Sequence, residues 1–321
     1  MEVNRVLPRS RVHERKGEPG HPRLVVWVKL EKPVLAAWAF FLLASMGVGQ
    51  EPAKPADSAT PTPVASRSTQ AVRFIPVSRE VIEARLQQFE TTNAKRKASL
   101  GRMFQEAGCI GDRLREEKVK GSRLPNLVCS LPGETDAIIL VGAHYDLAER
   151  GKGVVDNWTG AALLPTLLVS LAGHARSHTF VFVGFTDEEK GLVGSKFYVS
   201  QLTPEEKQKI RAMVNLDTLG LSPTKVWVSR ADRKLLTALA AVAGAMKLPL
   251  QGVDVEKVGS SDSESFAQQN IPAITIHSVT QETFSILHSP KDTPEAVRFD
   301  DYYQSYRLIA AYLSYLDTQR D

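Results

Sequence analysis

Residues 153–191 read GVVDNWTGAALLPTLLVSLAGHARSHTFVFVGFTDEEKG, and this stretch decides the fold. It opens with a polar loop, Asp156–Gly160, and continues into an apolar run that predicts a buried helix over residues 160–172. The next apolar run, TFVFVGF at residues 179–185, predicts a strand that ends in Asp187, Glu188 and Glu189. A buried helix followed by a strand that ends in acidic residues indicates an α/β domain with a polar site at the strand end.

The same alternation of strands and helices extends on both sides of this stretch. The run AIILVGA at residues 137–143 is typical of a strand buried on both faces, and further strands are expected at 212–216, 225–229 and 272–277, with an edge strand within 119–131. Helical periodicity covers 79–107, as one or two helices, and also 232–247 and 299–316, while a capping box at Thr203–Glu206 starts another helix. The pattern predicts a three-layer α/β fold: a mixed, mostly parallel sheet with helices on both faces.

The N-terminal region has a different composition. The uncharged apolar run at residues 34–44 follows Lys29 and Lys32 and precedes small residues, the order of a secretory signal peptide, and it is shorter than the ~20 residues of a membrane span. Residues 50–70 are rich in Pro, Ala, Ser and Thr and are typical of a flexible linker. We therefore expect an extension with a signal peptide over 1–49, a linker over 50–70 and the folded domain over 71–321. The protein would be secreted or periplasmic, or else anchored to the membrane by residues 33–49.

Charge and cysteine content exclude some classes of function. The net charge of +4 lies in residues 1–32, which hold eight Lys and Arg against four Glu, so the remainder carries 32 charges of each sign. Such a balance indicates no nucleic-acid partner, and nothing in the sequence points to an obligate protein partner. Cys109 and Cys129 are an even pair in an exported chain, so they are either a disulfide or two buried thiols.

Acidic and imidazole side chains follow several of the predicted strands. His144, Glu188, Glu189 and Asp217 come directly after strands, while Asp156 and His288 lie in loops. Because the carboxyl ends of parallel strands meet at one edge of a sheet, we expect these residues to converge. Imidazole and carboxylate ligands without thiolate suit zinc, with manganese or cobalt as alternatives. Two His and three carboxylates exceed one tetrahedral site and suit two metal ions that share a carboxylate, leaving one adjacent Glu as a general base.

The motifs GAHYD, DNWTG, DEEKGLVGS, NLD and LHSPKDT occur in this order from about Asn126 to the C-terminus. In this they resemble the co-catalytic zinc aminopeptidases, a family that includes relatives of glutamate carboxypeptidase and the glutaminyl cyclases. The resemblance implies a phosphorylase/hydrolase-like zinc-peptidase fold and two zinc ions. It also implies that the chain hydrolyses N-terminal residues of peptides. From the N-terminal segment itself, we expect membrane contact only if that segment stays uncleaved.

By the same resemblance, His144 and Asp217 bind one zinc ion, Glu189 and His288 bind the other, and Asp156 bridges the two. Glu188 is then the general base that activates the bridging water and passes its proton to the leaving amine. Asp146, two residues after His144, orients the imidazole. The Asp156–Asn157 peptide corresponds to one that is often cis in the family.

Two departures from the family pattern affect the surroundings of the predicted metal site. Leu287 stands where some members have a Tyr before the last His, and the family's Ser-Asp-His-x-x-Phe run appears here as Ser261–Phe266 without its His. Asp262 within this run either faces the cleft or caps a helix. Trp158 and His277 each either line the pocket or pack in the core. The alternatives to an aminopeptidase are a glutaminyl-peptide cyclotransferase, a carboxypeptidase, and a binding protein with a degenerate site; the last is disfavoured because all expected ligands and the base are present.

Overall fold

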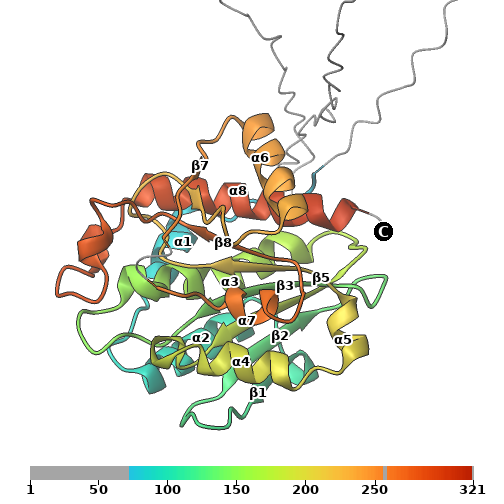
Figure 1. Cartoon of the computed structure of the whole chain (residues 1–321), viewed down its shortest axis with the longest axis horizontal. Coiled ribbons are helices and arrows are strands. Elements are labelled where there is room, and N and C mark those ends of the chain that lie inside the picture. The colour runs from blue at the N-terminus through green and yellow to red at the C-terminus, as the bar shows by residue number, and fades with distance from the viewer. Residues whose placement is uncertain (1–71, 256–258, 320–321) are drawn as a thin grey trace, which may run out of the picture.

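The computed structural model describes residues 72–255 and 259–319, which form an eight-stranded sheet covered by helices on both faces (Figure 1). The predicted signal or anchor segment, the linker over 50–70 and the proposed domain start at residue 71 lie outside the described residues. The strands are β1 (Leu114–Glu117), β2 (Asn126–Leu131), β3 (Ile138–His144), β4 (Thr179–Phe185), β5 (Ile210–Leu216), β6 (Lys225–Val226), β7 (Gln251–Gly252) and β8 (Ala273–His277).

The strand order is β1-β2-β4-β3-β5-β8-β6-β7. The central strands β4, β3, β5 and β8 are parallel, whereas β2 is antiparallel to both β1 and β4, and β6 is antiparallel to β8. The prediction of a mixed, mostly parallel sheet is therefore confirmed. The expected edge strand within 119–131 is wrong in position: β2 pairs on both sides, because the short strand β1 before it forms the edge.

The expected strand over 225–229 is also longer than the observed one. After two residues β6 ends, and the Ala231 N–H donates to the Val228 carbonyl in a turn. Asp232 then caps α6 by accepting hydrogen bonds from the N–H groups of Lys234 and Leu235. The observed strand is shorter because the turn before this helix already begins at Val228, inside the predicted strand.

The helices form two layers. The first face of the sheet packs against α1 (Arg79–Leu86), α2 (Asn93–Glu106), α3 (Thr159–Ala172), α6 (Arg233–Met246) and α8 (Phe299–Thr318), and the opposite face packs against α4 (Val193–Ser200) and α7 (Ser263–Ala267), with α5 (Pro204–Lys209) after α4. In β3, Ile139 and Val141 belong to the first core, whereas Leu140 belongs to the second. This alternation follows from the period of two in a strand, and it explains why β3 is apolar throughout.

The apolar helix α3 lies in the middle of the first layer. Within the described residues, the segment Val154–Ala172 is long and apolar enough to cross a membrane, but 94% of it is buried inside the protein. Its hydropathy therefore reflects a core helix, as the sequence predicts. Cys109 and Cys129 form a disulfide that ties the turn after α2 to β2, which resolves the two alternatives left by the sequence.

Candidate metal centre

The carboxyl ends of β3, β4 and β5 lie next to one another, so the residues that follow these strands meet at one edge of the sheet. His144 ends β3, Glu188 and Glu189 form a 3₁₀ turn after β4, and Asp217 follows β5. These residues line one cavity of about 480 Å³, together with the two predicted ligands that lie in loops. The structure thus brings together all the residues expected to bind metal.

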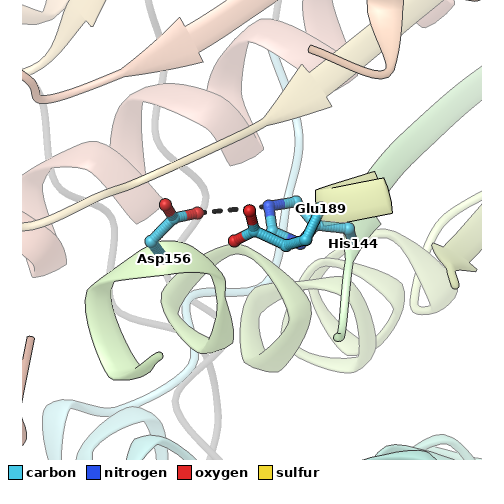
Figure 2. Close-up of side chains that lie close together, drawn as sticks. All are labelled: His144, Asp156 and Glu189. Atoms are coloured by element: carbon cyan, nitrogen blue, oxygen red, sulfur yellow. Dashed lines mark ion pairs between the residues drawn. The ribbon is translucent and has the colours of Figure 1, made fainter. Parts of the chain in front are cut away.

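Asp156 lies between two imidazoles. Its Oδ1 is 3.2 Å from His144 Nε2, the contact drawn in Figure 2, and its Oδ2 is 3.1 Å from His288 Nε2. Each oxygen of this carboxylate therefore faces a different histidine. This is the arrangement expected of a carboxylate that is shared between two metal ions.

The remaining ligands divide into two sets around Asp156. In the inner half, His144 Nε2 lies 3.7 Å from Asp217 Oδ1. In the outer half, His288 Nε2 lies 3.0 Å from Glu189 Oε2. With Asp156, each half offers one imidazole nitrogen and carboxylate oxygens from two residues.

The loop that carries Asp156 is held by its neighbour Asn157, and the peptide between them is cis. The Asn157 amide donates to the carbonyl of Leu216 at 2.8 Å, and its Oδ1 accepts hydrogen bonds from the N–H groups of Gly160 and Thr218. At Gly160 a Cβ atom would lie 2.5 Å from the Leu216 carbonyl, so this close packing of the loop against the end of β5 requires glycine.

Asp292 holds the same loop from the other side. Its Oδ1 accepts a hydrogen bond of 2.7 Å from the Val155 N–H, and its Oδ2 accepts one of 3.2 Å from the Asp156 N–H. We did not predict this role, although Asp292 lies in the motif LHSPKDT, four residues after His288. The motif therefore supplies both a candidate ligand and the carboxylate that fixes the backbone of Asp156.

Arg96 is a second residue that sequence reasoning missed. It projects from α2, is fully buried, and lies 5.5 Å from the ring of Trp158. Its guanidinium donates to carbonyl groups of the segments around the site, those of Tyr145, Asp146, Lys152 and Gly153. An Arg in an amphipathic helix is ordinarily assigned to the exposed face, so the pattern held no signal for it. Trp158, against which Arg96 packs, is itself fully buried beneath the loop and is not among the residues that line the cavity.

Asp146 connects the inner half to the adjacent glutamates. Its Oδ1 lies 3.5 Å from His144 Nδ1 and accepts a 3.1 Å hydrogen bond from the Glu188 N–H. Its Oδ2 accepts from the Glu189 N–H at 3.3 Å. One buried carboxylate therefore lies beside the imidazole of His144 and fixes the backbone of both glutamates.

The carboxylates of the centre create a strong negative field. Burial lowers the pKa of His144, but the surrounding carboxylates, led by Glu188, outweigh it and hold the pKa well above its usual value. Hydrogen bonds to Asp156 and Glu189 raise the pKa of His288 to about 10. Burial raises the pKa of Glu188, Glu189 and Asp217. The centre thus favours positive charge between its ligands, which a metal cation supplies better than protons.

The chemistry of the residues fits zinc. The ligand atoms are imidazole nitrogens and carboxylate oxygens, and His144, Asp156 and Glu189 alone place three such atoms within 4.8 Å of one another. In addition, Glu189 Oε1 is buried without a hydrogen-bond partner. A buried carboxylate oxygen that lacks a partner is costly unless a cation compensates it.

The far side of the cavity is a pocket without formal charge. Apolar side chains from the segments after β6, β7 and β8 line it: Trp227, Val255, Val279, Phe284 and Leu287. His277 also lines it and is buried, so both alternatives for this residue hold. Its Nδ1 accepts a hydrogen bond from the Val279 N–H, its Nε2 lies 3.0 Å from the Val253 carbonyl, and burial lowers its pKa to about 4. This imidazole is therefore neutral.

Asp262 lies at the start of α7 and is fully buried, but its side chain makes no capping hydrogen bond. Ser261 beside it lines the cavity. Burial raises the pKa of Asp262 to about 7. Neither alternative predicted for Asp262 describes it fully, since it is buried behind the cavity wall.

The model of peptidase family M28 matches residues 126–313, more than half of the chain. The chain belongs to this family. The family model covers the predicted ligands, the base and strands β2 to β8. The predicted family and fold class are thus confirmed.

Individual relatives agree with this assignment. An aminopeptidase of Pseudomonas aeruginosa (strain UCBPP-PA14) is 41% identical over 88 residues, which are 27% of this chain and 16% of that protein. Among solved structures, the LapA aminopeptidase of Legionella pneumophila matches with a TM-score of 0.63 at 19% identity, over 75% of this chain and 71% of that one. An Acidobacteriales bacterium glutaminyl cyclase matches with a TM-score of 0.63 at 16% identity, over 80% and 99%. The chain spans about a third or less of the length of the curated relatives it matches.

Proposed function

We propose that this chain is an exported aminopeptidase with two zinc ions, which hydrolyses N-terminal residues from peptides. The observation that carries the proposal is the position of Asp156, whose two oxygens face His144 and His288 separately. A carboxylate shared in this way gives two metal sites a few ångströms apart, and such pairs are typical of metal-dependent hydrolases. Curated relatives named aminopeptidases support the same activity.

In this proposal His144 and Asp217 hold one zinc ion, His288 and Glu189 hold the other, and Asp156 bridges them. When bound, zinc polarises the scissile carbonyl and lowers the pKa of water. The protein orients the ligands through three contacts described above: Asp146 on His144, Asp292 on the backbone of Asp156, and Asn157 on the end of β5.

Glu188 is the proposed general base. It lines the cavity, its neighbour Glu189 is a metal ligand, and its own N–H is fixed by Asp146. Burial raises the pKa of its carboxyl group, and Asp262 and Asp217 act in the same direction. A raised pKa suits a carboxylate that takes a proton from the attacking water and returns it to the leaving amine near neutral pH.

The charge of the cavity favours an aminopeptidase over a carboxypeptidase. Four carboxylates line it, those of Asp156, Glu188, Glu189 and Asp217, and its lining includes no Lys or Arg among the described residues. Recognition of a C-terminal carboxylate ordinarily uses Arg or Lys, and this lining supplies neither. The uncharged pocket beyond the centre then accepts the side chain of the N-terminal residue.

A glutaminyl-peptide cyclotransferase is the second candidate. It is favoured by one observation: the match to the bacterial glutaminyl cyclase covers 99% of that chain.

Export is supported by the Cys109–Cys129 disulfide, since disulfides persist mainly in oxidising compartments. We propose a secreted or periplasmic location, with an anchor over residues 33–49 as the alternative, a linker over 50–70 and a peptidase domain over 71–321.

The test uses the full chain loaded with zinc. We would compare the hydrolysis of aminoacyl-nitroanilides that have a free amine with that of their N-acetylated forms, and follow an N-terminal glutaminyl peptide for ring closure. Cleavage restricted to free amines supports the aminopeptidase. Cyclisation without hydrolysis would replace it with the second candidate, and cleavage of N-blocked peptides from the C-terminus would replace it with a carboxypeptidase. The Glu188→Gln variant, purified in parallel, controls for contaminating peptidases.

A further inference from the structure

The loop between β1 and β2 is rich in exposed cations. Lys118, Lys120 and Arg123 are exposed, and within the described residues none of them forms an ion pair. The nearest acidic residue in sequence, Glu117, is already engaged by Arg115 and Asn126. The proposed catalytic reaction uses none of these cations.

This loop lies at the same sheet edge as the metal centre. Because β2 is antiparallel to β4, the start of β2 is level with the carboxyl end of β4. Ser122 Oγ is 3.4 Å from Thr186 Oγ1, two residues before Glu188, and the Asn126 side chain bonds to the Gly194 carbonyl. A Cβ atom on Gly121 would lie 4.0 Å from Val193, the first residue of α4, and β1, β2 and α4 lie together in the lower part of Figure 1.

Lys196 extends this basic surface to the cavity itself. It lies on α4, is exposed, and its Nζ donates a 3.0 Å hydrogen bond to the carbonyl of Gly191, which lines the cavity. Lys196 also has no acidic partner within the described part of the chain. We call Lys118, Lys120, Arg123 and Lys196 the basic rim.

The sheet order places the basic rim and the uncharged pocket on opposite sides of the centre. The pocket is lined from β8 and the segments after β6, β7 and β8, whereas the rim borders β2 and β4. If the N-terminal residue occupies the pocket and its peptide bond lies at the centre, the remainder of the peptide leaves towards β2. A peptide residue spans about 3.3 Å, so the third and fourth residues reach beyond the strands that carry the centre.

We propose that the basic rim binds the downstream part of the substrate and selects peptides with acidic residues two to three positions after the scissile bond. This inference rests on the proposed aminopeptidase function and names the substrate class of the same site. Opposite charges on the rim and on the downstream part of the substrate attract each other, and this attraction raises the rate of productive encounter.

The test compares three peptides that share their first two residues: Leu-Ala-Asp-Asp-amide, Leu-Ala-Asn-Asn-amide and Leu-Ala-Lys-Lys-amide. We expect kcat/KM to be about tenfold higher for the acidic than for the basic peptide at low salt, and the ratio to shrink towards one at high salt, because exposed charges are screened. The triple variant Lys118→Gln, Lys120→Gln, Arg123→Gln should reduce this ratio to about two, and Lys196→Gln should reduce it partly. Release of leucine from the Asn-Asn peptide should stay unchanged.

A matched control removes three cations near the amino end of β5: Lys207→Gln and Lys209→Gln in α5, and Arg211→Gln in β5. It should leave the ratio as in the wild type, and an equal loss in both triple variants would overturn the proposal in favour of a net-charge effect. Hydrolysis of all three peptides at equal rates would overturn the basic rim but not the aminopeptidase. If no peptide is cleaved, the proposed aminopeptidase function is wrong, and the rim is then tested by equilibrium binding of the same peptides to zinc-loaded Glu188→Gln. Tighter binding of the acidic peptide supports the proposed role of the basic rim. Equal binding of all three peptides, or no binding, overturns it.

Discussion

The two halves of the proposed metal centre differ in how the fold holds them. In the inner half, His144 ends a central strand, and its side chain is 1% exposed. In the outer half, His288 lies in a loop, its backbone has a left-handed φ of 52°, and its side chain is 57% exposed. A ligand on a strand between two neighbours is preorganised, whereas a ligand on an exposed loop depends on the conformation of that loop. The inner half should therefore hold its ion more firmly.

The largest effect is expected where the two halves meet. Asp156→Asn removes one charged oxygen from the carboxylate that both halves share, so both ions should be lost and kcat/KM should fall by at least about a thousandfold. Metal content after gel filtration, measured by atomic absorption, checks this. If one ion remains bound at wild-type affinity, Asp156 belongs to a single half.

Glu188→Gln separates catalysis from metal binding. The change removes the proton acceptor and keeps the shape of the side chain, so kcat should fall by about 10²–10⁴-fold while both halves keep their metal. Parallel assays of kcat and zinc content on one preparation give the result. Full activity in this variant would mean that another group takes the proton.

His144→Ala and His288→Ala test the difference between the halves directly. In the metal-free proteins, His144→Ala should lower the free energy of unfolding by about 2–3 kcal/mol, because it empties a buried site and leaves Asp146 without its partner. His288→Ala should cost less than about 1 kcal/mol, since its side chain is mostly exposed.

Zinc release gives the matching kinetic evidence. With excess chelator, the wild type should release zinc in a fast phase from the outer half and a slow phase from the inner half, and His288→Ala should lack the fast phase. Equal unfolding costs for the two variants, with single-phase release from the wild type, would show that the halves are equivalent.

Asp146→Asn should weaken zinc binding, but less than the change at Asp156 does. The amide oxygen still accepts a backbone hydrogen bond, but the charge beside His144 is lost, so zinc affinity of the inner half should drop about 10–100-fold with the outer half little changed. Competition with a zinc-sensitive dye measures both affinities. A larger loss in the outer half would mean that Asp146 acts mainly through the N–H of Glu189.

Much of the fold was predictable because its signals are local. The continuous apolar runs of β3 and β4 report burial on both faces, and the capping box at Thr203–Glu206 marks the start of α5. The edge strand was misplaced because strand pairing has no local signal. Nothing within β2 indicates that the short, charged strand β1 would pair with its outer side, since pairing depends on residues elsewhere in the chain.

The candidate site divides in the same way. The candidate ligands could be found because strand ends in a parallel sheet share an edge, and the family motifs added a role for each of them. Arg96 and Asp292 could not be found, because each acts on backbone groups about 50 to 140 residues away. A hydrogen bond to a distant carbonyl or N–H leaves no mark on the local pattern.

The sequence by itself determined the order of strands and helices, the buried α3, and the acidic and imidazole residues at one edge of the sheet. The elements follow from hydrophobic periodicity, which acts on short stretches of chain. The placement of the site follows from the rule that the carboxyl ends of parallel strands share one edge of a sheet. Only the tertiary structure decided that Asp156 presents one oxygen to each histidine, that Cys109 meets Cys129, and that the basic rim borders the catalytic cavity. Those depend on distances between segments far apart in the chain, which packing sets and no local pattern encodes.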